Sequence, residues 1–315
     1  MQIFTDNHIL DILVGSLTAL AICMAAGFVG RKIGILTDTV NAGLSGVLVK
    51  IALPCMVFVS MMRPFSRELL FESLATLFIT GIVYVAGCFT GLLLARMFGA
   101  SEGEKRVWQF SLTFANVAYM GFPVTYALYG YEGMIYTTMA TAAFNILVFS
   151  LGVYLFKKNA GADAKVNLKP LILNPALVAI YIGFLFFVME WRLPENIEHG
   201  IGLVGNMSIP LSMMLVGSIL AKNRLSTLFD DIKIVPVFIM RLFGLPLVTF
   251  FILRMFLQNN VMLEVIVLLV AMPPAAITVI FAEQYNGDTA VASKLVALSS
   301  VLCLISIPII SLVIQ

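Results

Sequence analysis

The sequence predicts an all-α polytopic membrane protein. Hydrophobic residues make up 61% of its 315 residues, and charged residues only 11%. A helix that spans a bilayer needs ~20 mostly apolar residues, and the chain holds about ten such stretches joined by short polar connections. Two of these stretches contain prolines near their middle, which a continuous helix in lipid tolerates poorly. Composition and length together exclude a soluble domain.

The first half of the chain contains five of these stretches. We predict spans at residues 9–29, 41–62, 69–98, 108–129 and 133–156. The turn before the fourth span, residues 101–106, has the sequence SEGEKR. A serine followed by acidic residues predicts the start of a helix, because the hydroxyl caps free N–H groups and carboxylates favour the positive end of the helix dipole.

A polar linker, residues 157–169, divides the chain, and five further spans follow it. We predict them at residues 171–189, 197–220, 234–257, 261–281 and 290–314. The chain therefore divides into a first five-helix repeat (1–156), the linker, and a second five-helix repeat (170–315). Because an odd number of spans reverses the direction of entry, we predict two inverted repeats, with the fourth and ninth helices discontinuous and crossed.

Positive charges predict the orientation in the membrane. Twelve lysines and arginines fall on the side of the linker, and four fall on the other side. The four are Arg63, Arg67, Arg192 and Arg254. Cytoplasmic loops carry the excess of positive charge. We therefore expect a cytoplasmic linker and both termini outside the cytoplasm.

The two interrupted spans predict a binding site. Residues 111–123 include Asn116, Gly121 and Pro123, and residues 271–278 include Pro273 and Pro274. Interrupted helices at matching places in two halves are typical of transporters that bind substrate at the middle of the bilayer. Where such helices meet, the N-terminal ends of half-helices favour a carboxylate. We expect the glycine and the prolines to shape the break rather than to contact substrate by side chain.

Three polar residues within the predicted spans are candidates for substrate contact. The amide of Asn116 offers both a donor and an acceptor, for substrate or for bridging the freed backbone. The hydroxyl of Thr278 is a second candidate, with a hydrogen bond back to its own helix as the alternative. Asn145, midway along the fifth predicted span, is a third, with an interhelical hydrogen bond as the alternative.

Charged residues inside the spans are the costliest ones for membrane insertion. Lys50 lies near the middle of its span, where lysine costs ~2.5–3.5 kcal/mol. It is a countercharge for an anionic substrate, a group whose protonation changes during transport, or a structural group that reaches the interface or bonds backbone carbonyls. Asn206 stands at the corresponding place of the second half, four residues before a proline. Arg241 and Lys294 lie closer to span ends, so we expect them to anchor the helices at the membrane interface.

Several chemistries lack their sequence signals. There is no phosphate-binding glycine loop, no metal-ligand spacing among the histidines and cysteines, and no paired carboxylates within the spans. Basic clusters with interleaved aromatic residues are also missing, so no nucleic acid partner is predicted. We therefore expect no catalytic residues, no cofactor and no metal site, and the chain is not predicted to be an enzyme.

Several segments of the chain resemble the auxin efflux carrier family. Residues 116–123, NVAYMGFP, are similar to the first crossover of that family, and residues 272–274, MPP, to the second. Residues 281–286 (FAEQYN) and the pair Asn174 and Pro175 resemble the family too, so the likeness covers nearly the whole chain. The resemblance implies that helices 3–5 and 8–10 form a transport domain that moves, like an elevator, against a scaffold of helices 1, 2, 6 and 7. It also implies the fold of bile-acid symporters and sodium/proton antiporters, with Asn116 in the substrate site.

Family membership would imply the substrate class and the setting. Its members include plant auxin exporters and bacterial permeases for malate or malonate, so the implied substrates are small organic carboxylates. The short linker, and a third span without the acidic and basic pair of plant members, favour the bacterial branch and an inner-membrane location. Plant members form dimers, which implies a homodimer here.

The function predicted is that of a secondary carrier that exports a small organic anion by alternating access. One alternative is a sodium- or proton-coupled symporter on the same fold. The other is a membrane receptor or sensor without flux.

Overall fold

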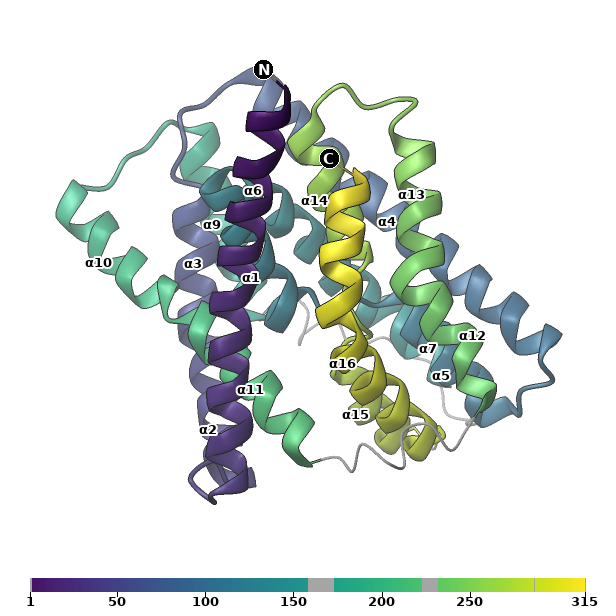
Figure 1. Cartoon of the computed structure of the whole chain (residues 1–315). Coiled ribbons are helices and arrows are strands. Elements are labelled where there is room, and N and C mark those ends of the chain that lie inside the picture. The colour runs from purple at the N-terminus through teal and green to yellow at the C-terminus, as the bar shows by residue number, and fades with distance from the viewer. Residues whose placement is uncertain (1, 158–172, 223–231, 286, 315) are drawn as a thin grey trace.

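The computed structural model describes residues 2–157, 173–222, 232–285 and 287–314, and within these ranges every regular element is a helix, joined to the next by turns and short loops (Figure 1). Extended pairing in these ranges is limited to an isolated antiparallel bridge between Ala115 and Pro274. The first and last helices, α1 (Gln2–Lys32) and α16 (Thr289–Ile314), have their outer ends at the same end of the molecule.

The first half of the chain forms long helices with local irregularities. After α1 come α2 (Asp38–Val47), the π-helical turn η1 (Leu48–Ala52), α3 (Leu53–Ser60), α4 (Arg67–Met97), α5 (Glu102–Thr113), η2 (Val117–Gly121), α6 (Phe122–Leu147), η3 (Val148–Gly152) and α7 (Val153–Lys157). Gly130 kinks α6 with a φ of 57°, a conformation that glycine adopts at little cost. The kink falls where we predicted the boundary between the fourth and fifth spans.

The second half repeats this mixture of long and interrupted helices. It contains α9 (Pro175–Val188), α10 (Glu195–Asn206), α11 (Ser208–Lys222), the short turn η5 (Ile232–Ile234), α12 (Val235–Ile239), η6 (Met240–Gly244), α13 (Leu245–Leu253), α14 (Asn260–Val270), α15 (Ile277–Gln284) and α16. The predicted linker, residues 157–169, lies outside the described residues except for Lys157.

Six helical runs in the described residues are long and apolar enough to cross a membrane. They are Asp38–Ser60, Arg67–Met97, Val117–Phe156, Glu195–Ala221, Val235–Leu253 and Thr289–Ile314, while Pro175–Val188 and Asn260–Val270 are apolar but shorter. The count is lower than the predicted ten, partly because the fourth and fifth predicted spans share one run and the ninth is split into α14 and α15. The arrangement as two inverted five-helix repeats stays a prediction.

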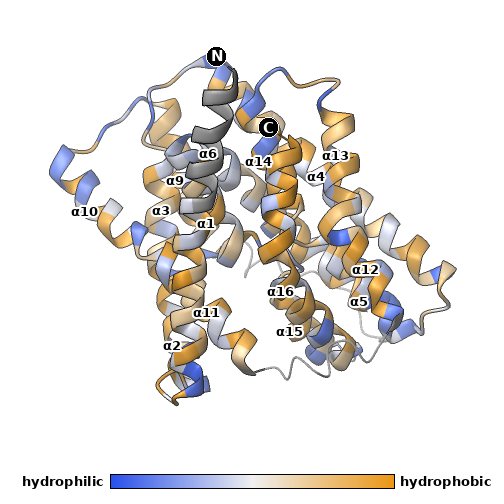
Figure 2. Cartoon of the chain, in the orientation of Figure 1, coloured by the Kyte–Doolittle hydropathy of each residue, from blue (hydrophilic) through white to orange (hydrophobic). Residues whose placement is uncertain are grey.

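Helix α4 shows why these helices suit a bilayer. Its outward face is apolar, with Phe71, Phe78 and Phe89 each at least 66% exposed. Its inward face carries small and polar residues, including the fully buried Ser73 and Thr76. A soluble helix has the opposite distribution, whereas lipid accepts the apolar face and helix–helix contacts use the small one. Figure 2 shows hydrophobic residues along the helices and hydrophilic ones gathered near helix ends.

Caps and close backbone contacts determine where the helices begin and how they pack. The predicted start of α5 is confirmed, because the Ser101 hydroxyl accepts from the Glu104 backbone N–H and the Ser101 backbone N–H donates to the Glu104 carboxylate at 2.7 Å. This backbone hydrogen bond is the main reason why the pKa of Glu104 is lowered. Helices α1 and α11 approach so closely that a Cβ on Gly217 would overlap the backbone carbonyl of Met24.

Candidate functional site

Two helices are interrupted at the centre of the molecule, and the interruptions contact each other. Helix α5 ends at Thr113 and the chain continues in extended form to Asn116, while α14 ends at Val270 and α15 begins at Ile277. The Asn116 backbone N–H donates to the Pro273 carbonyl at 2.8 Å, and the Ala275 N–H donates to the Phe114 carbonyl at 2.9 Å. The two broken segments therefore satisfy part of each other's backbone.

Proline explains why α14 ends where it does. Pro273 and Pro274 lack the N–H groups that would continue α14, and their rings clash with the preceding turn. Pro123 lies in the first turn of α6, where a missing N–H costs nothing. Freed backbone groups survive in the bilayer interior only where protein or a wet cavity covers them. All three prolines are buried.

The N-terminal ends beyond both breaks carry free backbone donors. The Asn116 side chain accepts from the Tyr119 N–H at 3.2 Å, and its backbone carbonyl accepts from the Gly121 N–H at 3.0 Å. The backbone N–H groups of Ala118, Ala276 and Ile277 donate no hydrogen bond within the described residues. Unpaired donors at helix N-termini attract negative charge.

A cavity of about 250 Å³ lies against these N-terminal ends. Its polar lining comes from Asn116, Tyr119, Thr141, Asn145 and Asn174. The rest of the lining is apolar and comes from both breaks and from neighbouring helices: Val49, Leu53, Val57, Ala115, Val117, Ala118, Phe122, Phe144, Ala176, Ala275, Ala276, Ile277 and Ile280. No aspartate, glutamate, lysine, arginine or histidine of the described residues lines it, so its potential comes from backbone and amide dipoles.

The polar side chains of the cavity differ in how much of their hydrogen-bonding capacity is used. Asn145 donates to the Thr141 carbonyl at 2.8 Å and accepts from the Asn174 amide at 3.1 Å, so it joins α6 to the start of α9. The Tyr119 hydroxyl is hydrogen-bonded to Ser45 of α2. The Asn116 amide nitrogen donates no hydrogen bond within the described residues and is free for a ligand.

The other predicted residues of the crossover are structural in their contacts. Gly121 packs against α14, because a Cβ there would lie 2.8 Å from a Leu269 methyl group. Thr278 is fully buried, and its hydroxyl donates to the Ala275 carbonyl at 2.6 Å. Pro273 contributes its backbone carbonyl, and Pro274 pairs with Ala115. Neither these predicted residues nor Pro123 line the cavity.

Lys50 and Asn206 are not brought to the crossover cavity. Lys50 is exposed in η1, although its neighbours Val49 and Leu53 line the cavity. Asn206 ends α10 and accepts from the Tyr131 hydroxyl at 3.2 Å. It lines a separate cavity of about 1110 Å³, between α3 and α10.

Arg241 is the residue of this region that sequence analysis placed wrongly. Its side chain is 1% exposed, so it does not anchor the helix at a membrane interface. Its Nε donates to the Met272 carbonyl at 2.9 Å, and its Nη1 donates to the Leu112 carbonyl at 2.8 Å. The guanidinium therefore contacts the C-terminal ends of both broken helices. The signal available for finding it was a charged residue inside an apolar span.

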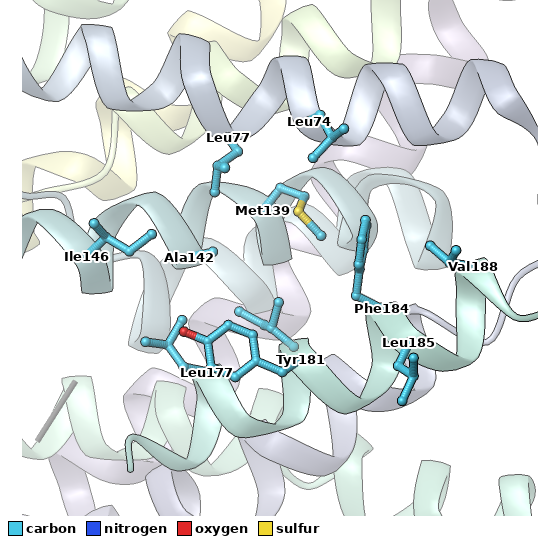
Figure 3. A pocket seen from close by; sticks show the side chains of 11 residues that line it. Leu74, Leu77, Met139, Ala142, Ile146, Leu177, Tyr181, Phe184, Leu185 and Val188 are labelled. Atoms are coloured by element: carbon cyan, nitrogen blue, oxygen red, sulfur yellow. The ribbon is translucent and has the colours of Figure 1, made fainter. Parts of the chain in front are cut away.

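A larger cavity, of about 470 Å³, does not suit an anion. It lies between α4, α6 and α9, and Figure 3 shows its lining of leucine, methionine, phenylalanine and other apolar side chains. The Tyr181 hydroxyl is the one polar side-chain group among its described lining residues. With no convergent donors, this cavity suits hydrocarbon, whereas the crossover cavity combines apolar walls with aimed polar groups.

The chain is similar in sequence to known membrane transporters. Residues 12–311 match the family described as "Membrane transport protein". An "Uncharacterized transporter" of Methanothermobacter thermautotrophicus is 25% identical, over 91% of this chain and 93% of its own length. The "Uncharacterized transporter YfdV" of Escherichia coli is 24% identical, over 92% and 94% of the two chains. The chain therefore belongs to the membrane transport protein family, which is the auxin efflux carrier family that its two crossover segments resemble.

Proposed function

We propose that this membrane transporter is a secondary carrier of small organic anions and that the crossover cavity is its substrate site. The observation that carries the proposal is the convergence of two helix N-termini with free N–H groups on one cavity that also holds the free amide of Asn116. Each helix N-terminus carries roughly half a positive charge. Two of them offset about one negative charge, which matches a single carboxylate.

The cavity lining supports a particular kind of carboxylate. Besides the donors, the walls are apolar, with Leu53, Phe122, Phe144 and Ile280 among them. The volume lies just below the range of ~300–1,000 Å³ typical of sites for drug-sized ligands. A second charged group would meet no countercharge among the described lining residues. We therefore favour a monocarboxylate with an apolar body over a dicarboxylate such as malate or malonate.

The proposed mechanism is alternating access of this single site. Val49, Leu53 and Val57 line the cavity from the proposed scaffold, while Asn116 and Ala276 line it from the proposed transport domain. Movement of one set against the other would expose the cavity to either side. Because a membrane potential contributes ~2.3 kcal/mol per charge per 100 mV, an interior-negative potential by itself drives export of an anion.

The same proposal includes three further features: ten spans in two inverted repeats, an inner-membrane location with both termini outside the cytoplasm, and a homodimer. The transport family and the two meeting breaks support the first of these. The shared end of α1 and α16 supports termini on one side.

Flux measurements test the function directly. Purified protein in liposomes would be loaded with labelled aromatic and aliphatic monocarboxylates or with dicarboxylates, and efflux measured under an imposed potential. We expect monocarboxylate efflux that responds to the potential and not to sodium or a pH gradient. A sodium or proton requirement would instead establish the symporter alternative. Saturable binding without flux, seen as a thermal shift, would establish the receptor alternative.

A further inference from the structure

Arg241 is a buried cation without an acidic partner. It is 1% exposed and lies in the π-helical turn η6, inside the run Val235–Leu253 that is apolar enough to cross a membrane. Its hydrogen bonds go to two backbone carbonyls, and no described aspartate or glutamate forms an ion pair with it. Burying a charge is costly unless the surroundings compensate for it, so the carbonyls must supply the compensation.

The two carbonyls belong to the helix ends that carry negative partial charge. Leu112 lies in the last turn of α5, and Met272 follows the last residue of α14, Val270, by two positions. A helix C-terminus carries roughly half a negative charge. Two such ends sum to about one negative charge, which one guanidinium neutralises. In broken-helix transporters, unwound carbonyls and half-helix C-termini of this kind hold the coupling cation.

We propose that Arg241 is a built-in cation that occupies the place of a coupling ion at the crossover, so that transport needs no sodium. The expected effect of Arg241 on flux rests on the proposed carrier function. Its expected effect on protein stability does not. Arg241 does not line the substrate cavity. It is a positioning residue that keeps the two C-terminal ends together, and thereby keeps the two N-terminal ends facing the substrate.

The packing around these carbonyls closes the position to exchange. A Cβ on Gly87 of α4 would overlap the Leu112 carbonyl, so the α4 backbone lies directly against that group. A free ion could therefore replace the guanidinium only after the side chain is removed. Shortening Arg241 should leave two unsatisfied carbonyls around a space of guanidinium shape.

Chemical rescue of Arg241→Ala tests the inference. We expect this variant to have a lower Tm than the wild type, and millimolar guanidinium to raise its Tm by several degrees, because a ligand that binds only the folded state stabilises it. Tetramethylammonium at equal concentration should have no effect. Arg254→Ala is the matched control, because Arg254 is exposed over the Phe250 ring. Neither the control nor the wild type should gain stability from guanidinium.

Flux gives the second readout. Wild-type efflux should be equal in sodium, potassium and choline, and efflux by Arg241→Ala should depend on added guanidinium. If Arg241→Ala cannot be purified, Arg241→Lys and Arg241→Gln replace it, and only the neutral glutamine variant should need a cation. The inference would be overturned if wild-type efflux required sodium, or if no cation changed the Tm of the neutral variants. If the Tm of the neutral variants depends on a cation but no flux is seen, the role of Arg241 stands and the carrier function is rejected.

Discussion

Replacing Asn116 by aspartate separates the electrostatic argument from the structural one. Aspartate has nearly the same shape as asparagine and caps a helix N-terminus equally well. The hydrogen bond from the Tyr119 N–H at 3.2 Å should therefore persist, and the variant should fold. The free amide donor, however, becomes a carboxylate oxygen that faces the cavity. A carboxylate substrate then meets a like charge where it met a donor.

The magnitude follows from the geometry. Two unit charges about 4 Å apart interact by ~4 kcal/mol at an effective dielectric constant of ~20, which corresponds to about 1,000-fold in affinity. Asn116→Ala removes only the donor. A hydrogen bond to a charged group contributes ~1.5–3 kcal/mol, so we expect affinity to fall about 10- to 100-fold, together with a loss of ~1 kcal/mol in stability from the missing cap.

The assay is binding and efflux of a labelled monocarboxylate by the three proteins at neutral pH. The expected order of affinity is wild type, then Asn116→Ala, then Asn116→Asp, while the Tm of the aspartate variant stays near that of the wild type. A neutral analogue of the substrate, such as the amide, should lose much less affinity with aspartate. If the carboxylate binds Asn116→Asp as tightly as the wild type, the cavity is not an anion site and the reasoning fails.

Three further predictions concern packing, pH and the exposed lysine. Gly217→Ala should destabilise the protein by ~1–3 kcal/mol, since the added Cβ would overlap the Met24 carbonyl, whereas Gly46→Ala, with open space around it, should leave the Tm unchanged. Because the pKa of Glu104 is lowered, the ionised carboxylate stabilises the fold above the ordinary glutamate pKa of ~4.3, and this stabilisation is lost as pH falls through the lower pKa of the folded state. Glu104→Gln should therefore reduce the fall in Tm at acidic pH. An unchanged acidic part of the Tm-versus-pH curve would refute this. Lys50→Ala should leave substrate affinity unchanged, because Lys50 is exposed and outside the cavity; a clear loss in the binding assay would place Lys50 in the site.

Local signals in the sequence were sufficient for part of the fold and part of the site. Proline restricts the backbone next to it, so the break at 271–276 could be predicted from Pro273 and Pro274, whereas Pro123 lies in the first turn of α6, beyond the break at 114–116. Asn116 could be placed in an interrupted stretch, residues 111–123, because a polar amide, Gly121 and Pro123 occur together there. The capping box of α5 depends on residues three positions apart. Composition was sufficient for the membrane class, because soluble domains have about 25% charged residues whereas this chain has 11% and is 61% hydrophobic.

Which face of each helix points inward was decided by the tertiary structure alone. Lipid and a protein core are equally apolar, so hydropathy along a membrane helix cannot distinguish the two faces. For this reason Arg241 was expected at an interface and is buried, whereas Lys50 was a candidate for the substrate site and is exposed outside it. The partners of Arg241 lie 31 and 129 residues away in the chain, and no local pattern encodes such distances. Sequence alone therefore determined where the helices break, and only packing determined which charge lies beside the broken ends.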